Sequence, residues 1–263
     1  MKRIILSAFV LALIAGLSAC SKDNVTETGL SPEVISAITA KGFNPSDAFA
    51  TDGGYIVEGD IFLTDEDLFG NPFTNPFKLI VGNEEQYHTT NLVTGLPRTI
   101  VVSTTGSIPS ALSTAIDAAI ARYNAENLQL TFVRGGAGGG GNINIRTLNT
   151  RQYIASAGFP SGGNPYNEII YSTRYVNGYS QGFITTVVAH EMGHCIGFRH
   201  TDYMNRAYSC GSGGNEGSAG VGAIHIPGTP TGPDPNSWML ACLGATTNRP
   251  FNANDKTALD YLY

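Results

Sequence analysis

The chain of 263 residues has few basic side chains, few cysteines and no long internal apolar run. Its 15 lysines and arginines stand against 21 acidic residues, which gives a formal net charge of −6. Proteins that bind nucleic acid need a basic stripe, so this balance argues against such a partner. The main apolar run, Ile4 to Leu17, is shorter than the roughly 20 residues of a membrane-spanning helix. We therefore do not expect a transmembrane anchor.

Residues 1–19 combine Lys2 and Arg3 with that apolar run and contain no acid, which is typical of a secretory signal. They lead into Leu17-Ser18-Ala19-Cys20, which resembles a bacterial lipobox, where cleavage precedes the cysteine and the cysteine carries a lipid. A plain signal peptide with an incidental cysteine is the alternative. Ser21, rather than aspartate, follows Cys20. We expect an exported bacterial lipoprotein, with its lipid anchor at the outer membrane or cell surface.

Beyond Cys20 the chain has three cysteines, namely Cys195, Cys210 and Cys242. In an oxidising compartment two of the three are expected to pair. We favour a disulfide between Cys210 and Cys242, because these two residues bracket a long glycine-rich loop. Cys195 is then a buried free thiol. Spacing alone does not fix this connectivity.

With 42% hydrophobic residues, the chain can bury one sizeable core. A polar tether is expected over residues 20–30, followed by a short helix that begins at Ser31-Pro32. A strand carrying two acids is predicted over Gly53 to Leu63. β-Branched and alternating apolar residues predict further strands, and a helix that begins at Pro109 separates the first two of these. The predicted strands are residues 99–103, 128–133, 142–148, 153–160 and 168–172.

The glycine-rich run 135–141 lacks the Gly-Lys-Ser/Thr ending of a phosphate-binding loop and is read as a flexible connection. Near the end of the chain, Asn252 is expected to cap a short helix with Asp255 at its third position. Together these elements predict an α+β fold.

Residues 185–202 read TTVVAHEMGHCIGFRHTD and contain the pattern H-E-x-x-H-x-x-G-x-x-H. On a helix capped by Ser180, His190 and His194 lie one turn apart on the same face and can bind a single zinc ion. Glu191 lies beside the ion without binding it and is expected to be the general base. Gly197 can adopt the left-handed conformation that ends the helix, which brings His200 back as the third ligand.

A bare H-E-x-x-H motif occurs by chance in unrelated chains, and a lone histidine on an apolar helix is usually structural. The extended pattern fixes five positions from His190 to His200 and uses three of the five histidines, so a chance origin is much rarer. Three protein ligands leave one zinc position open, as catalytic sites do. His225, which lies between Ile224 and Ile226, is read as structural rather than as a fourth ligand.

On this motif the sequence resembles the metzincin zinc endopeptidases, and more narrowly the bacterial dual-action HEIGH metallopeptidases; Met192 makes the motif HEMGH here. The resemblance implies a metzincin-like zincin fold. Its twisted, mostly parallel sheet would have five strands, one of them an antiparallel edge strand. A long helix, an active-site helix and an irregular C-terminal subdomain containing a Met-turn would complete the fold. Met239 is the candidate for that turn. Ala241 stands where the astacin branch has a tyrosine, so a tyrosine ligand is not expected there.

The resemblance also implies that residues 31–85 are a pro-like segment before a catalytic domain at 86–263. Metzincin pro-segments often block zinc with a cysteine, but no cysteine lies between Cys20 and Cys195. If the segment is inhibitory, Asp60, Glu58 or His88 would have to supply the blocking ligand. The alternative is that these acids are ordinary solvated residues.

The strand at residues 153–160 resembles the metzincin edge strand above the cleft, whose backbone can pair with an extended peptide. The long stretch between His200 and Met239 is read as a substrate-shaping loop. We therefore expect a monomeric endopeptidase with one catalytic zinc that acts on protein or peptide substrates. Alternatives are a surface binding module or adhesin that retains the metal site, and an enzyme for small amides or esters. The sequence does not identify a calcium site.

Overall fold

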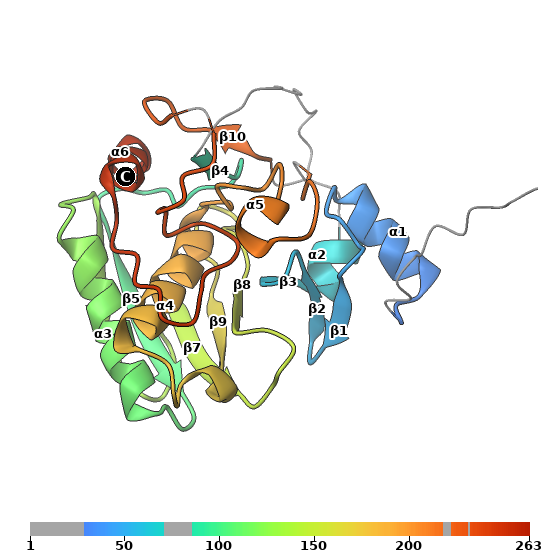
Figure 1. Ribbon diagram of the computed structural model, residues 1–263. Helices are drawn as coiled ribbons and strands as arrows, with labels where there is room; N and C mark the ends of the chain where they lie inside the picture. Colours follow the sequence, from blue (N-terminus) through green and yellow to red (C-terminus); the bar gives the residue numbers. More distant parts are fainter. Residues whose placement is uncertain (1–28, 71–85, 218–221, 231) are drawn as a thin grey trace, which may run out of the picture.

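The computed structural model describes residues 29–70, 86–217, 222–230 and 232–263. The predicted signal peptide and Cys20, the proposed lipid attachment residue, lie outside the described residues. In the part of the chain that is described, no helix combines the length and the apolar character needed to cross a membrane. Figure 1 shows a central sheet with the N-terminal elements at one end and the long helices packed on the remainder.

One mixed sheet of eight strands runs through the molecule in the order β1-β2-β3-β8-β9-β7-β5-β6. β6, β5, β7 and β9 are parallel, whereas β8 is antiparallel to β9. The predicted α+β class is confirmed. The predicted count of five strands is wrong, because β3 pairs with β8 and brings β2 and β1 into the same sheet. The strands are β1 Phe49–Thr51, β2 Gly54–Val57, β3 Ile61–Thr64, β5 Arg98–Thr105, β6 Leu130–Arg134, β7 Ile143–Leu148, β8 Ala155–Ala157 and β9 Glu168–Ser172.

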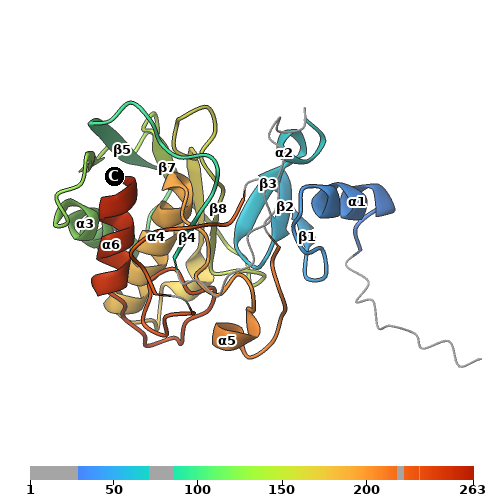
Figure 2. The same ribbon diagram turned by 90° about the horizontal axis from the view of Figure 1, so that it is seen from above.

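Two long helices, α3 (Ser110–Asn124) and α4 (Gln181–Ile196), pack against each other and share the main core with the sheet. Figure 2 shows them on one side of the sheet. The Ser180 hydroxyl accepts a hydrogen bond from Phe183 N at 3.1 Å and caps α4, as predicted. Every residue of α4 from Phe183 to Ile196 is buried. Polar side chains on this helix must therefore find partners inside the protein.

The N-terminal segment, as we call residues 29–70, consists of α1 (Pro32–Ala40), β1 to β3 and α2 (Asp65–Phe69). It has a small apolar core of its own, to which the rest of the chain contributes Phe159. Its hairpin also packs against Tyr153 and Ile170 through Ile56 and Phe62. The N-terminal segment thus has its own core and joins the rest of the described chain along the edge of the sheet.

The prediction of one continuous strand over Gly53 to Leu63 is wrong. The structure forms a hairpin, in which β2 and β3 pair antiparallel around Glu58, Gly59 and Asp60. Glu58 has φ 55° and Gly59 has φ 91°, and these two left-handed residues reverse the chain. Apolar alternation on both sides of the turn hid this reversal in the sequence.

β8 corresponds to the predicted edge strand, but it is shorter than predicted and its edge is not free. β3 runs parallel to it, with Ile61 opposite Ala157. Ala157 N donates to the backbone oxygen of Asp60 at 3.1 Å. The N-terminal segment therefore already occupies the edge that was expected to receive a peptide.

The remaining elements are short: β4 (Tyr87–His88) pairs with β10 (Ile224–His225), and η1 (Thr173–Tyr175), α5 (Ala207–Cys210) and α6 (Ala253–Leu262) complete the fold. A disulfide joins Cys210 to Cys242, the pair favoured from the sequence, and Cys195 is a buried free cysteine. The capping box of Asn252 and Asp255 begins α6 as predicted. His225 Nε2 lies 3.0 Å from the Thr229 hydroxyl rather than among the other histidines.

Candidate metal centre

Helix α4 and the turn after it place three histidine rings around one point. His190 and His194 are one turn apart, and their Nε2 atoms are 3.0 Å from each other. Gly197 adopts the left-handed conformation with φ 111° and ends the helix. The chain then returns so that His200 Nε2 lies 3.2 Å from His194 Nε2. The structure thus brings together the three histidines that the motif predicts.

The opposite ring nitrogen of each histidine faces an oxygen atom. His190 Nδ1 is 2.8 Å from Trp238 O, and His194 Nδ1 is 2.8 Å from Phe198 O. His200 Nδ1 is 2.9 Å and 3.1 Å from the two carboxylate oxygens of Glu216. Each Nδ1 therefore donates its hydrogen outward, which leaves the Nε2 atom of each ring to face the shared point and a metal ion.

Asp60 supplies a fourth ligand atom from the turn between β2 and β3. Its Oδ2 atom lies 3.2 Å from His200 Nε2 and 3.4 Å from His190 Nε2. Of the three residues considered as blocking ligands, Asp60 is the one at the metal site. Glu58 instead pairs with Arg199 at 3.1 Å, and the His88 ring lies against Thr89 O at 2.7 Å.

These residues fit a divalent metal ion. One ligand atom from each of Asp60, His190, His194 and His200 lies within 4.8 Å of the others. Tetrahedral zinc with metal–ligand distances near 2.0 Å would separate its ligand atoms by roughly 3.3 Å. Four of the six separations, between 3.0 and 3.4 Å, match this spacing. All six lie within 4.8 Å. Three imidazole nitrogens and a carboxylate oxygen are ligand atoms that zinc commonly binds.

Burial and mutual interactions shift the pKa values at this site in different directions. Burial lowers the pKa of His194, and the neighbouring His190 and His200 lower it further. Burial also disfavours the charged form of His200, but Asp60 and Glu216 outweigh burial and raise its pKa well above the usual value. Although burial opposes ionisation of Asp60, His200 and His190 hold its pKa well below the usual range. The direction of this shift favours the ionised carboxylate of Asp60.

Glu191 lies beside the histidines and is 2% exposed. Burial, and then the charge of Asp60, raise its pKa well above the usual value. Its Oε2 atom has no hydrogen-bond partner among the described residues. It lines a cleft of about 210 Å³ together with His190, Asp60 and Val187. A carboxylate held this way can accept a proton from a molecule in the cleft.

Met239 is fully buried near the C-terminal turns of α4. A Cβ atom on Gly193 would come within 2.6 Å of the Met239 sulfur, so a larger residue at position 193 would displace the Met239 side chain. Met239 O accepts a hydrogen bond from Thr201 N at 2.9 Å, next to His200. The Met239 loop thus supports both the helix and the turn that carry the histidines.

Three charged residues near this site occupy no defined position of the sequence motif. Glu216, Arg199 and Arg206 are joined, with Glu216 oxygens 3.5 Å from Arg199 Nη2 and 3.2 Å from Arg206 Nε. Arg206 also pairs with Asp47 of the N-terminal segment at 2.8 Å. Glu216 lies 16 residues after His200, beyond the short helix α5, so no single helical or strand period connects the two.

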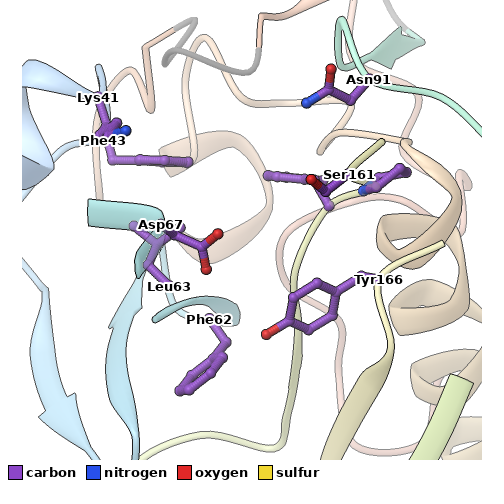
Figure 3. Close-up of a pocket in the computed structure, with 10 residues that line it drawn as sticks. Lys41, Phe43, Phe62, Leu63, Asp67, Asn91, Ser161 and Tyr166 are labelled. Atoms are coloured by element: carbon purple, nitrogen blue, oxygen red, sulfur yellow. The ribbon is translucent and has the colours of Figure 1, made fainter. Parts of the chain in front are cut away.

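A second hollow lies between the N-terminal segment and the rest of the chain. It has a volume of about 50 Å³ and none of its lining residues is a metal-site residue. In Figure 3, Phe43, Leu63 and Asp67 of the segment face Asn91 and Tyr166 across it. The contact between the two parts is therefore incompletely packed at this point.

Comparison with known proteins gives one family and several structures. The family model described as dual-action HEIGH metallo-peptidase matches residues 57–263, which include Asp60 and the three histidines. No curated protein matches the chain. A structure of myroilysin is similar, with 15% identity over 66% of this chain and 96% of that chain and a TM-score of 0.45.

Two further solved structures show weaker similarity. A crystal structure of myroilysin has 15% identity over 64% of this chain and 83% of that chain, with a TM-score of 0.42. High choriolytic enzyme 1, a hatching enzyme zinc-protease from the medaka fish Oryzias latipes, has 14% identity over 54% of this chain and 67% of that chain, with a TM-score of 0.33.

Proposed function

We propose that this chain, which belongs to the dual-action HEIGH metallopeptidase family, is a zinc-dependent endopeptidase that hydrolyses extended protein or peptide substrates. The observation that carries the proposal is the convergence of three Nε2 atoms beside the buried Glu191 in a cleft. His190, His194 and His200 would hold the zinc ion. Met239 would form the Met-turn that supports them.

When bound, zinc polarises the scissile carbonyl and makes a coordinated water more acidic. Glu191 takes a proton from the attacking water as the new carbon–oxygen bond forms. It then gives that proton to the nitrogen of the leaving amine as the carbon–nitrogen bond breaks. Glu191 is buried, and its Oε2 atom has no competing hydrogen bond among the described residues. The edge of β8 would hold the substrate backbone in an extended conformation.

We further propose that residues 31–85 are an inhibitory pro-segment and that Asp60 is its blocking ligand. Two contacts of the same residue support this. The backbone oxygen of Asp60 accepts a hydrogen bond from Ala157 N on β8, while its carboxylate lies 3.2 Å from His200 Nε2. The segment thus occupies the substrate edge and the fourth metal position together. Residues 86–263 would then be the catalytic domain.

The proposed location remains an outer-membrane or surface lipoprotein anchored through Cys20. The support is the sequence Leu17-Ser18-Ala19-Cys20 after an apolar stretch. Mass spectrometry of protein purified from a bacterial membrane would show a lipid on Cys20. A Cys20→Ser variant found in the membrane in equal amount would contradict this assignment.

The experiment that tests the peptidase proposal is digestion of a mixed peptide library with mass-spectrometric readout. It uses the intact chain and an Asp60→Ala variant, with and without a chelator. Cleavage within peptides that stops on chelation and returns with zinc is the expected result. No cleavage by either protein, or by the wild type after limited proteolysis has removed residues 31–85, despite bound zinc, would contradict the proposal and favour the binding-module alternative.

A further inference from the structure

We propose that Glu216 is the positioning residue for the third metal ligand, holding the His200 ring in the tautomer and orientation that direct Nε2 to the metal. The inference rests on the proposed zinc site and adds a residue that neither the motif nor the spacing of the histidines identifies. Glu216 does not face the metal. It acts through His200.

The surroundings of the three histidines differ in a way that explains why His200 needs such a partner. His190 and His194 are fixed by α4, and their Nδ1 atoms meet backbone carbonyl oxygens at 2.8 Å. His200 lies beyond the end of α4, where no helix fixes its ring. Its Nδ1 atom meets the Glu216 carboxylate at 2.9 Å and 3.1 Å. The residue with the least support from secondary structure has the only charged Nδ1 partner of the three.

Glu216 is itself held in place by contacts with other residues of the protein. Its backbone N–H donates to Tyr203 O at 2.7 Å, which fixes the chain shortly beyond His200. Its carboxylate pairs with Arg206 at 3.2 Å and Arg199 at 3.5 Å. Glu216 and Arg199 are each 1% exposed. A buried carboxylate requires such partners, and two arginines supply the compensating positive charge.

The charge on Glu216 has a chemical consequence at the opposite nitrogen of His200. A hydrogen bond from an N–H group to a carboxylate is stronger than one to a neutral carbonyl. By drawing the Nδ1 hydrogen outward, Glu216 increases the electron density available at Nε2 for a metal. Loss of such an outer partner typically weakens metal binding by ~10–100-fold.

The test compares zinc affinity in the full-length chain for the wild type, Glu216→Gln and Glu216→Ala. Glutamine keeps an oxygen acceptor without the charge, whereas alanine removes both. Asp234→Asn is the matched control, because Asp234 is also a buried acid in the long loop and pairs with Asn252 and Asn254 instead of a histidine. Chelator competition measures the zinc dissociation constant. Absorption of the cobalt-substituted protein reports ligand geometry.

We expect zinc affinity to fall by ~10–100-fold in Glu216→Ala, by less in Glu216→Gln, and to stay within about twofold in Asp234→Asn. The cobalt spectrum should change in the two Glu216 variants alone. If both Glu216 variants bind zinc as tightly as the wild type and show the same cobalt spectrum, the inference is overturned and the peptidase proposal is unaffected. Failure of the wild type to bind stoichiometric zinc would overturn both.

A measurement on the wild type covers the case in which the Glu216 variants do not fold. In zinc-loaded protein labelled with ¹⁵N-histidine, NMR identifies which nitrogen of each ring carries hydrogen. We expect the Nδ1 hydrogen of His200 to resonate farther downfield than those of His190 and His194, because its acceptor is charged. A His200 ring protonated at Nε2, or a Nδ1 hydrogen no different from the other two, would overturn the inference.

Discussion

The residues that face the metal position come from two distant parts of the chain. His190, His194 and His200 belong to one short motif, whereas Asp60 comes from the turn between β2 and β3, far earlier in the sequence. Glu191 lies next to the histidines in sequence and in space but contributes no atom to the group of four. Binding of the metal and transfer of the proton are therefore assigned to different side chains, which can be altered one at a time.

Replacing Glu191 with glutamine removes the proton acceptor while preserving the size of the side chain. We expect zinc content to stay at the wild-type level and kcat/KM to fall by ~10²–10⁴-fold or more, because the base and the proton donor are lost together. Metal analysis and peptide-cleavage kinetics on the same preparation check this. Substantial residual activity would exclude Glu191 as the base.

Replacing Asp60 with alanine tests its proposed blocking role. We expect the intact variant to cleave peptides faster than the intact wild type, since a carboxylate no longer competes for the fourth metal position. Each 1.4 kcal/mol of lost blocking energy corresponds to about tenfold in activity. Asp52→Ala is the control, because Asp52 is exposed in the same segment. Equal rates for the wild type and both variants would show that Asp60 does not restrain the enzyme.

At the scale of secondary structure, helix α4 and the turn at Gly197 determine the geometry of the site. The helix sets the separation of His190 and His194, and the left-handed turn returns the chain to place His200. The turn also packs tightly against its surroundings. A Cβ atom at position 197 would lie 2.7 Å from a Leu92 side-chain carbon and 2.9 Å from Asn91 O.

Gly197→Ala should therefore destabilise the protein at the end of α4. A left-handed alanine costs ~1–2 kcal/mol by itself, and the contacts with Leu92 and Asn91 add to that cost. Urea unfolding of the metal-free protein measures the change in the free energy of unfolding. Gly136→Ala serves as the control, since a Cβ atom there has no neighbour within 4 Å. The same unfolding midpoint for both variants would contradict this reading of the turn.

At the scale of the whole molecule, buried polar contacts connect segments that are far apart in sequence. Asp255 at the start of α6 accepts hydrogen bonds from Gln86 Nε2 at 2.7 Å and Trp238 N at 3.4 Å. It thereby joins three segments: the chain at Gln86, the loop that carries Trp238 and Met239, and the C-terminal helix α6. Burial raises the pKa of Asp255 to about 7, despite these hydrogen bonds.

This pKa predicts a stability that depends on pH. A folded-state pKa near 7, above the ordinary aspartate value of 3.8, means that the folded protein retains the proton more strongly than the unfolded chain. The stabilising contribution is fully present below the ordinary value and is lost as pH rises through about 7. One pKa unit corresponds to about 1.4 kcal/mol, so this residue changes the free energy of unfolding by at most a few kcal/mol between low and high pH.

Urea unfolding of the wild type and Asp255→Asn at pH 4, 6 and 8 measures this contribution. We expect the free energy of unfolding of the wild type, relative to the variant, to decrease as pH rises, because asparagine has no proton to lose in this range. A constant difference between the two proteins across these pH values would contradict the assignment to Asp255.

The sequence by itself determined the chemistry that depends on short-range spacing. Helical periodicity places His190 above His194, glycine at position 197 permits the reversal, and Ser180 and Asn252 are recognisable caps, since each depends on neighbours close in the chain. The strands at β5, β6, β7 and β9 were also predictable, because their apolar alternation is local.

Only the tertiary structure decided which distant residues meet. Three contacts join parts of the chain that no helical or strand periodicity connects. Asp60 lies at the three histidines, Glu216 contacts His200 from the side opposite the metal position, and β3 pairs with β8. The hairpin turn at Glu58 and Gly59 was also not predicted from the sequence, because two apolar alternating strands around a short turn resemble one continuous strand. Burial and charge pairing across the folded chain, rather than propensity, bring these residues together.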